Sequence, residues 1–570
     1  MGFTKWVIAP SPPLSLLNSF PSIPPLVVKI LYNRGARTPS QIEAFLRGGE
    51  EPFNPFKMKD MDKAVTRIRR AIKGREPIAI YGDFDVDGLA ATAILLETIR
   101  ALGGNVIPYI PDRLYEGYGL NKPALRSLAR KGIRLVITAD CGIRSIEEAR
   151  YARQIGLDLI ITDHHAIGPE IPPALAVINP KRADCLYPFK ELAGAGVAFK
   201  LSQALFLANR QVPISPLPVE EPELYDLVAL GTVADVVPLT GENRTLAVRG
   251  IQSLNSVARP GLRALMQVAG VAPGEIDSYA ISFILGPRLN APGRLTTAML
   301  SLDLLTSQDE AKALELAREL DRWNRQRQKL MNEHLEKARF KALELLERDL
   351  VLIVGDESFA PGVVGLVASK LVEEFYRPAV VMELSPERSR GSARSIPEFD
   401  ITAALDQCAD LLQKYGGHAA AAGLTLETRN LPALKVRLEE IARENLKGME
   451  LVPTLKIDAE TSLDQITPEL CHYISMLEPF GYANPEPLFL TRRVKVQEYR
   501  LVGEESRHLR LTLAWASRTW AAIGFRMGLR AGEVREFLDI VYTPKLTRWG
   551  NQEGVELHLR DFRPSASSYR

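Results

Sequence analysis

The sequence predicts an α/β protein built on a parallel, doubly wound sheet, followed by a long helix, a second α/β lobe and a C-terminal all-β barrel. Short apolar segments alternate with amphipathic segments between residues 77 and 180. The alternation returns between residues 350 and 447, after a long charged segment. From residue 453 onward the chain consists of short alternating strands. Strands that alternate with helices in this way are typical of a parallel sheet covered on both faces.

Composition fits a folded globular protein, since 46% of the residues are apolar and 25% are charged. At 570 residues the chain is too long for one hydrophobic core. No apolar run approaches the ~18 residues that a membrane-spanning helix needs, so we expect no membrane partner. Four scattered cysteines without a CxxC spacing predict a cytoplasmic protein that has no structural zinc and no disulfide.

The elements are expected in the following order. Residues 1–75 form a helical accessory segment, because Thr38 and Pro39 begin one helical pattern and MDKAVTRIRRAIK has helical apolar spacing. PIAIY, NVIPYI, LVITA, LDLIIT and LAVINP are the strands of the first sheet. Residues 192–300 are mostly helical, and the charged segment from about 307 to 348 contains no Pro or Gly, which indicates one connecting helix.

Polar side chains follow each of the first four strands directly. The carboxyl ends of parallel strands lie at one edge of the sheet, where ligands bind in this architecture. We therefore expect these side chains to converge on one point. They are Asp83, Asp85 and Asp87 after the first strand, Arg113 after the second, Asp140 after the third, and Asp163, His164 and His165 after the fourth.

The acidic cluster DFDVDG raises two interpretations. Taken alone, it is as consistent with a solvated turn that caps a helix as with a metal site. Two metal ions about 3.5–4 Å apart need a set of roughly six ligands, which a single turn cannot supply. Carboxylates bind Mg²⁺ and Mn²⁺, and an added imidazole favours Mn²⁺. A set of five at one edge therefore predicts a two-metal site: Asp85, Asp87, Asp140, His164 and Asp235.

In order along the chain, DFDVDG, PDRLYEGYGL, TADCGI, TDHH and LGTVADVVPL resemble the successive motifs of the DHH phosphoesterase superfamily. Further on, GPRLNAPGRL, GSARS and GGHAAAAGLT resemble the RecJ family of single-strand-specific 5′→3′ DNA exonucleases. The resemblance extends from Trp6 to about Arg560. It implies a DHH domain, a DHHA1 lobe and a C-terminal OB-fold.

The resemblance also implies roles for individual residues. Two Mn²⁺ or Mg²⁺ ions would be held by the five ligands above, with Asp140 as the bridge. His165 would face the scissile phosphate, and Asp163 would orient the imidazoles. The remaining expected site residues contact the DNA: Arg113, Ser392 and Arg394 at the 5′-terminal phosphate, Arg288, Asn290 and Arg294 at the backbone near the cut, and His418 from the GGH motif.

One position departs from related manganese pyrophosphatases, which carry a ligand histidine four residues before the first paired aspartate. Tyr81 occupies that position here. Tyrosine is a poor ligand for Mn²⁺, so Asp83 or water is expected to complete the coordination shell of one ion. Asp83 would then be an extra ligand, or it would hydrogen-bond to the ligands without contacting the ion. The departure argues against a pyrophosphatase.

The function expected from these features is a metal-dependent single-stranded-DNA-specific 5′→3′ exonuclease that releases 5′-mononucleotides in DNA repair and recombination. Two alternatives stay open: a DHH-superfamily phosphodiesterase for short oligonucleotides, and a catalytically inactive single-strand-binding replication factor. An aspartyl-phosphate phosphatase would leave the Asp-His-His triplet unexplained. Single-strand-binding protein and a RecQ-type helicase are expected partners, and the protein is expected to be a monomer.

The C-terminal region gives a separate indication. Between residues 452 and 570 there are 13 Arg and 3 Lys, interleaved with Trp515, Trp520, Tyr542 and Trp549. Arginines beside aromatics suit stacking and phosphate contact with single strands, although a barrel with core aromatics has the same composition. The expected domains are 1–75 (helical accessory segment), 76–300 (DHH with helical extension), 301–348 (connecting helix), 349–450 (DHHA1) and 451–570 (OB-fold-like).

Overall fold

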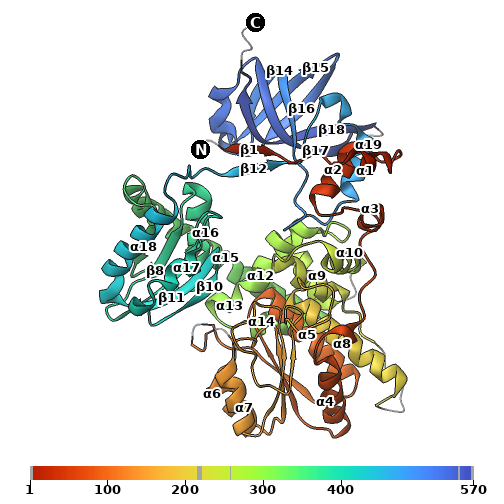
Figure 1. Ribbon diagram of the computed structural model, residues 1–570, viewed down its shortest axis with the longest axis vertical. Helices are drawn as coiled ribbons and strands as arrows, with labels where there is room; N and C mark the ends of the chain where they lie inside the picture. Colours follow the sequence, from red (N-terminus) through yellow and green to blue (C-terminus); the bar gives the residue numbers. More distant parts are fainter. Residues whose placement is uncertain are drawn as a thin grey trace.

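The computed structural model describes residues 4–113, 115–117, 119–214, 221–256, 259–549 and 552–566. Leu114 and Tyr118 of the PDRLYEGYGL motif, and the side chain of Trp549, lie outside the described part. The structure consists of two α/β lobes and a barrel, with the barrel at one end (Figure 1). Among the described residues, no helix combines the length and the apolar character needed to cross a membrane.

The first sheet is five-stranded and fully parallel, with strand order β3-β2-β4-β5-β6. Its strands coincide with the five predicted apolar segments, and the strand residues of the three central strands are almost entirely buried. The elements are β2 (Ile78–Gly82), α5 (Val86–Ala101), β3 (Val106–Tyr109), α6 (Lys122–Arg130), β4 (Leu135–Ala139), α7 (Ile146–Gln154), β5 (Asp158–Thr162) and β6 (Ala176–Ile178).

A helical layer follows the sheet, as predicted, and packs with it into one core. Its last element is a 36-residue helix, α15, which runs from this domain to the next lobe within the predicted charged segment (Figure 1). The elements are α8 (Gly194–Gln211), α9 (Tyr225–Ala234), α10 (Gly241–Ser256), α11 (Pro260–Ala269), the π-helical η2 (Ala280–Leu285), α12 (Gly286–Asn290), α13 (Pro292–Leu295), α14 (Met299–Thr306) and α15 (Glu310–Leu345).

The second lobe has a mixed five-stranded sheet with strand order β10-β11-β9-β8-β7. Only the β7–β8 pair is parallel, and β9, β10 and β11 form an antiparallel extension. The elements are β7 (Leu352–Asp356), α16 (Val364–Phe375), β8 (Ala379–Glu383), β9 (Arg388–Arg394), α17 (Ile401–Asp406), β10 (Lys414–His418), β11 (Ala421–Glu427) and α18 (Leu431–Asn445).

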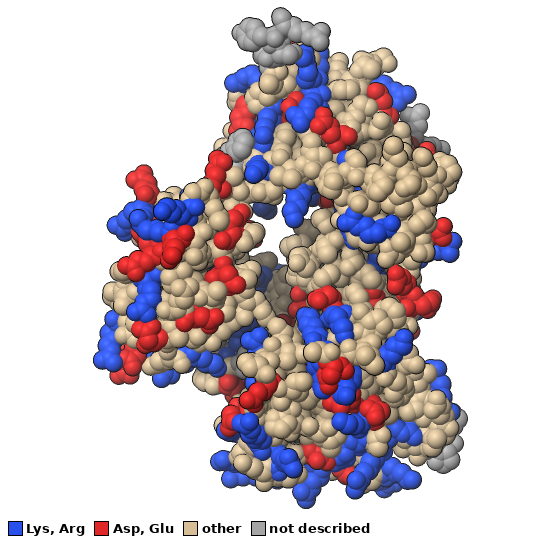
Figure 2. Space-filling model, in the orientation of Figure 1, with Lys and Arg blue, Asp and Glu red and all other residues tan. Residues whose placement is uncertain are grey.

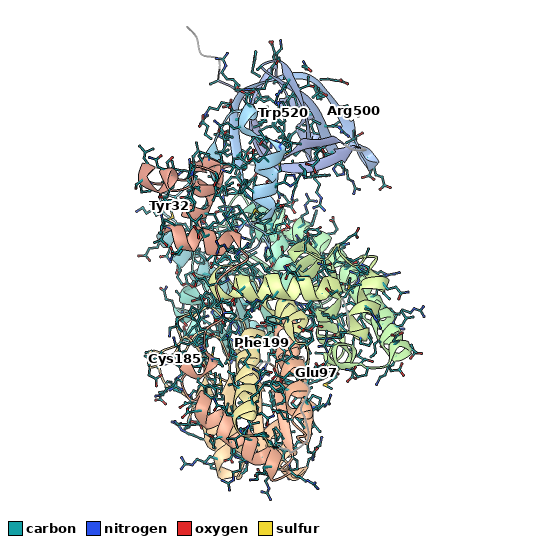
Figure 3. The ribbon with its side chains drawn as sticks, turned by 90° about the vertical axis from the view of Figure 1, so that its right-hand side faces the viewer. Tyr32, Glu97, Cys185, Phe199, Arg500 and Trp520 are labelled. Atoms are coloured by element: carbon teal, nitrogen blue, oxygen red, sulfur yellow. The ribbon has the colours of Figure 1, made fainter. Side chains whose placement is uncertain are left out.

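The C-terminal strands form a barrel that closes through the pairing of β14 with β17. Tyr542 is part of its core, and Trp515 and Trp520 pack against that core, so these three aromatics are structural. Trp520 is seen on the barrel in Figure 3. The elements are β12 (Thr454–Ile457), β13 (Ala459–Glu460), α19 (Pro468–Ser475), β14 (Phe489–Val502), β15 (His508–Trp515), β16 (Arg518–Gly524), β17 (Phe537–Trp549) and β18 (Gln552–Pro564).

The N-terminal segment, predicted to be helical, contains among its described residues four α-helices and also one strand. Residues Lys5–Ile8 form a strand, β1, that pairs in parallel with β12. The helices α1 (Leu14–Asn18), α2 (Pro25–Asn33) and α3 (Pro39–Leu46) pack against the barrel core, and Tyr32 lies beside the barrel in Figure 3. Only α4 (Met61–Lys73) joins the core of the first sheet. A lone strand whose partner is about 450 residues away leaves no periodic signal in the sequence.

Candidate metal centre and phosphate site

The acidic residues lie at the point where the first sheet changes direction. The chain leaves β2 for β3 on one side, while β4 pairs with β2 on the other. Asp83 and Asp85 follow β2, and Asp140 follows β4, so the two neighbouring strands deliver their carboxylates to the same crevice. Ligands bind at such a switch point in open α/β sheets.

Asp140 has a left-handed backbone with φ 65° and is 2% exposed. Its N–H donates to the carbonyl of Thr162 at 3.1 Å, which ties the turn after β4 to the end of β5. A non-glycine residue with positive φ costs free energy and is concentrated at functional sites. Helix α8 starts directly against this carboxylate, because a Cβ on Gly194 would lie 2.5 Å from the Asp140 Cγ.

Three groups of side chains could each hold a metal ion, because within each group the ligand atoms lie within 4.8 Å of one another. One group contains only carboxylates, and another combines two carboxylates with an imidazole. Asp140 is in the first group and, through the third, also adjoins His164 and His165. The three groups are Asp83, Asp85 and Asp140; Asp87, His164 and Asp235; and Asp140, His164 and His165.

His164 is surrounded by carboxylate oxygens. Its Nε2 lies 3.2 Å from Asp140 Oδ1, 3.5 Å from Asp235 Oδ2 and 3.8 Å from Asp87 Oδ2. Within the described part of the chain, this buried nitrogen makes no hydrogen bond. Burial and the neighbouring His165 lower the pKa of His164 to about 3, so the ring is neutral and its lone pair is available to a metal ion.

The carboxylates around His164 repel one another. Burial, then the charge of Asp85, raises the pKa of Asp87 to about 7. Burial, then Asp87 and Asp85, raises the pKa of Asp235 to about 9, and the pKa values of Asp83 and Asp140 are raised for the same reasons. A buried set of like charges needs cations to be ionised together, so these residues fit a metal centre.

Asp163 belongs to none of the three groups, but its carboxylate holds the turn that carries His164 and His165. Its Oδ1 accepts the backbone N–H groups of His164 and His165 at 2.7 and 3.0 Å and lies 2.8 Å from His165 Nδ1. Its Oδ2 accepts the N–H of Ile143 at 2.8 Å. Burial alone would raise the pKa of Asp163, but the hydrogen bond with His165 and the charge of that imidazole lower it.

A group of arginines borders the carboxylates. Arg113 lies over the ring of Phe84 at 4.8 Å, and burial lowers its pKa. Burial, then Arg113 and Arg327, lowers the pKa of Arg294 to about 9. Arg394 donates to Ser392 Oγ at 2.9 Å, and burial and Arg113 lower its pKa. The structure therefore brings Arg113, Arg294, Ser392 and Arg394 together from both lobes.

Two expected DNA-contacting residues are held by the protein itself. Arg288 pairs with Asp321 of α15 at 3.0 Å and donates to the carbonyl of Ile284. Asn290 Oδ1 accepts the N–H of Val86 at 3.1 Å, so it caps the helix that carries Asp87. These contacts hold the helices around the carboxylates in place. The sequence motif does not indicate such a supporting role.

His418 extends the site from the second lobe. Its ring is parallel to that of His165, with an interplanar angle of 7° and centroids 6.4 Å apart. The Tyr81 hydroxyl, by contrast, donates to the carbonyl of Gly119 at 3.0 Å. The space-filling view shows an opening between the second lobe, the barrel and the first domain, with basic side chains at its rim (Figure 2).

Residues that motif analysis did not single out complete the site. Asp87 accepts the N–H groups of Gly194 and Ala195 at 2.6 and 2.8 Å, so the start of α8 holds its carboxylate. A Cβ on Gly231 would lie 2.5 Å from Asp87 Oδ1. The small residues in ELAGAG and ALGTVAD are the one sequence signal for this close approach.

Comparisons with known proteins agree with this architecture. Three family models match: the DHH family N-terminal domain at residues 77–232, the DHHA1 domain at 349–444 and the RecJ OB domain at 457–561. The chain is 40% identical to the single-stranded-DNA-specific exonuclease RecJ of Bacillus subtilis over 95% of this chain and 68% of that one. It is 35% identical to the RecJ exonuclease of Escherichia coli over 86% of both chains.

Solved structures agree as well. The crystal structure of Thermus thermophilus RecJ in complex with Mn²⁺ superposes with a TM-score of 0.84 at 30% identity, covering 99% of this chain and 80% of that one. The same protein in complex with Mg²⁺ gives a TM-score of 0.77 at 29% identity, covering 99% and 79%.

Proposed function

Because the chain belongs to the RecJ family of single-stranded-DNA-specific exonucleases, we propose that the residues gathered around Asp140 form the metal centre of that activity. The protein is a metal-dependent exonuclease that acts on single-stranded DNA, with Mn²⁺ or Mg²⁺ as its cofactor. The observation that carries the assignment is the position of Asp140. Its carboxylate belongs both to the cluster with Asp83 and Asp85 and to the cluster with His164 and His165.

The residues divide between two ions. Asp83, Asp85 and Asp140 would hold one, and Asp87, His164 and Asp235 would hold the other, with Asp140 shared. This assignment gives Asp83 the ligand role that the sequence left open, and Tyr81 has none. When bound, the ions lower the pKa of a water nucleophile and neutralise charge on the phosphate during attack.

The chain's own residues orient the substrate around that centre. Because Asp163 holds His165 through Nδ1, the other ring nitrogen of His165 is directed to the cleft and donates to a non-bridging oxygen of the scissile phosphate. His418, parallel to His165, faces the same phosphodiester from the second lobe. Asn290 and Arg288 fix the helices on which the carboxylates and Arg294 stand.

The arginine group supplies the direction of cleavage. Arg113, Arg394 and Ser392 bind a 5′-terminal phosphate, and Arg294 contacts the backbone beside it, because guanidinium groups bind phosphate oxygens with directional donors. Since Arg113 is close enough to Asp83 and Asp85 to feel their charge, the terminal phosphate lies next to the metal centre. In this arrangement the enzyme works 5′→3′ and releases 5′-mononucleotides during DNA repair and recombination.

The barrel and the surroundings of the enzyme complete the proposal. The barrel binds the single strand beyond the cleft, mainly through arginines, because Trp515, Trp520 and Tyr542 are occupied in its core or against it. We further propose that single-strand-binding protein and a RecQ-type helicase are partners, that the protein is a monomer, and that it acts in the cytoplasm. All four cysteines are free and buried, in keeping with a reducing compartment.

Mononucleotide release tests the function. The wild-type protein and its Asp140→Asn variant are incubated with Mn²⁺ and one DNA sequence as a 5′-phosphorylated single strand, as a duplex and as a dinucleotide. We expect release of mononucleotides from the long single strand by the wild type only. Faster turnover of the dinucleotide would favour the short-oligonucleotide phosphodiesterase, and tight binding without turnover would favour the inactive replication factor.

A further inference from the structure

Gly365 lies in the first turn of α16, and its missing side chain leaves a space between two polar groups. A Cβ built on Gly365 would lie 3.0 Å from Ser392 Oγ and 3.1 Å from Arg394 Nη2. These are the two side chains of the second lobe that the proposed terminal-phosphate site uses. Any side chain at position 365 would therefore occupy the space in which both groups present their donors.

The loop before α16 fixes this glycine against the other lobe. A Cβ on Gly362 would lie 2.1 Å from the carbonyl oxygen of Arg294, and Arg294 Nη1 donates to the carbonyl of Gly362 at 3.2 Å. Only two residues therefore separate a backbone contact with the first domain from the space beside Ser392. The start of α16 lies between the arginine of one lobe and the arginine of the other.

The first amides of α16 lack acceptors. Val363, the N-cap, makes no side-chain cap hydrogen bond. Leu366 and Val367 donate to the carbonyl of Val363, but Val364 and Gly365 donate their N–H groups to no acceptor in the described part of the chain. First-turn amides of this kind, at the positive end of a helix, suit a phosphate oxygen.

The surrounding charges call for an anion at the same place. Arg113, Arg294 and Arg394 form no ion pair with a carboxylate among the described residues, and each is partly buried. Their positive charges repel one another, which lowers the pKa of Arg294 and of Arg394 beyond the effect of burial. A dianionic group next to Gly365 would relieve this repulsion.

We propose that Gly365 determines the specificity for a 5′-terminal phosphate. Its missing side chain provides the room for the phosphate, and its N–H, together with that of Val364, donates to a phosphate oxygen that Ser392 and Arg394 hold from the other side. The inference rests on the proposed function, because the phosphate is the end group of the DNA strand that the metal centre cleaves.

The test compares kcat/KM for 5′-phosphorylated and 5′-hydroxyl single strands of one sequence. In the Gly365→Ala protein we expect the preference for the phosphorylated strand to fall roughly tenfold or more, through loss on that strand alone. Alanine is a better helix former than glycine, so the helix itself is not weakened. Gly532→Ala is the control, because a Cβ there meets nothing within 4 Å.

A second measurement does not depend on the variant. Hydrogen–deuterium exchange of the segment 364–366 is followed in the Asp140→Asn protein with either oligonucleotide bound. Slower exchange with the phosphorylated strand, and not with the hydroxyl strand, is expected. A folded Gly365→Ala protein with unchanged preference, or equal exchange with both strands, would overturn the role of Gly365. A wild-type enzyme without any phosphate preference would instead overturn the terminal-phosphate site itself.

Discussion

Asp163 Oδ1 lies 2.8 Å from Nδ1 of His165 and also accepts the backbone N–H groups of His164 and His165. One carboxylate thus fixes the turn that carries both histidines and the ring orientation of the second. His164 is left with its Nε2 among three other carboxylates. We therefore propose different tasks for the two adjacent histidines: His164 would bind metal, and His165 would face the substrate.

Replacing Asp163 by Asn should separate these tasks. The amide has one accepting oxygen and no charge, so it cannot serve the Ile143 N–H as well as the histidine turn, and it holds the His165 ring less firmly. We expect kcat to fall roughly 10–100-fold. Mn²⁺ affinity, measured by isothermal titration calorimetry, should change much less than kcat. A loss of Mn²⁺ binding in proportion to the loss of kcat would show that Asp163 acts on the metal centre instead.

Replacing Asp140 by Asn should stabilise the metal-free protein while it removes metal binding. The carboxylate is buried next to Asp87, Asp85 and Asp235, and neutral Asn relieves that repulsion. We expect a higher Tm than the wild type in EDTA and a much smaller increase on addition of Mn²⁺. A lower Tm in EDTA together with normal Mn²⁺ binding would be incompatible with a shared ligand at position 140.

The stability of the metal-free protein should depend on pH through Asp87 and Asp235. Their folded pKa values, about 7 and about 9, exceed the unfolded value of about 3.9, so the folded state binds more protons over this range. The stability present below the unfolded pKa is therefore lost as pH rises through the folded pKa values. Urea unfolding in EDTA should show this decline, and Asp235→Asn should remove its alkaline part. Saturating Mn²⁺ should abolish it; an identical slope with and without Mn²⁺ would argue against ligation by these groups.

Arg394 provides a test of the terminal-phosphate site that is independent of Gly365. Losing charge-assisted hydrogen bonds to the phosphate should lower kcat/KM for 5′-phosphorylated strands roughly 10–100-fold in Arg394→Ala, with a small effect on 5′-hydroxyl strands. Arg394→Lys should lie between, because an ammonium group keeps the charge without the planar fork. Equal losses on both strands would mean that Arg394 serves the fold of β9 alone.

Arg244 should matter for stability and not for chemistry. Its buried guanidinium donates to the carbonyls of Phe45, Met476 and Leu477, so it joins α10 to the N-terminal helices and to the segment after α19. Arg244→Met leaves three carbonyls without these donors, which should lower the free energy of unfolding by about 3 kcal/mol or more. The control is Arg249→Met, whose side chain is 38% exposed and pairs with Glu51. Equal stabilities of the two variants would contradict this role.

The catalytic sheet could be predicted from sequence because its signals are local. A buried strand followed at once by Asp, His or Arg is visible in consecutive residues, and parallel strands bring their carboxyl ends to one edge. This is why LDLIITDHH, GDFDVDG and TADCG could be placed at a common site. The two lobes and the barrel were predicted for the same reason, from local alternation and a helix without Pro or Gly.

Long-range features carried no such signal. The pairing of β1 with β12 joins residues about 450 positions apart. The capping of α5 by Asn290 joins two sequence motifs, and neither motif indicates a contact with the other. The acidic triplet after β2 left the role of Asp83 open, since alternation groups Asp83, Asp85 and Asp87 alike, whereas the structure divides them between two groups. The sequence could not show which barrel aromatics lie in the core and which on the surface, because successive side chains of a strand alternate between the two faces.

Anomalous diffraction from a crystal soaked in Mn²⁺ tests the central claim most directly. Two manganese peaks about 3.5–4 Å apart are expected. One should lie among Asp83, Asp85 and Asp140 and the other among Asp87, His164 and Asp235, with the Asp140 carboxylate contacting both. A single peak, or two peaks that do not share Asp140, would contradict it.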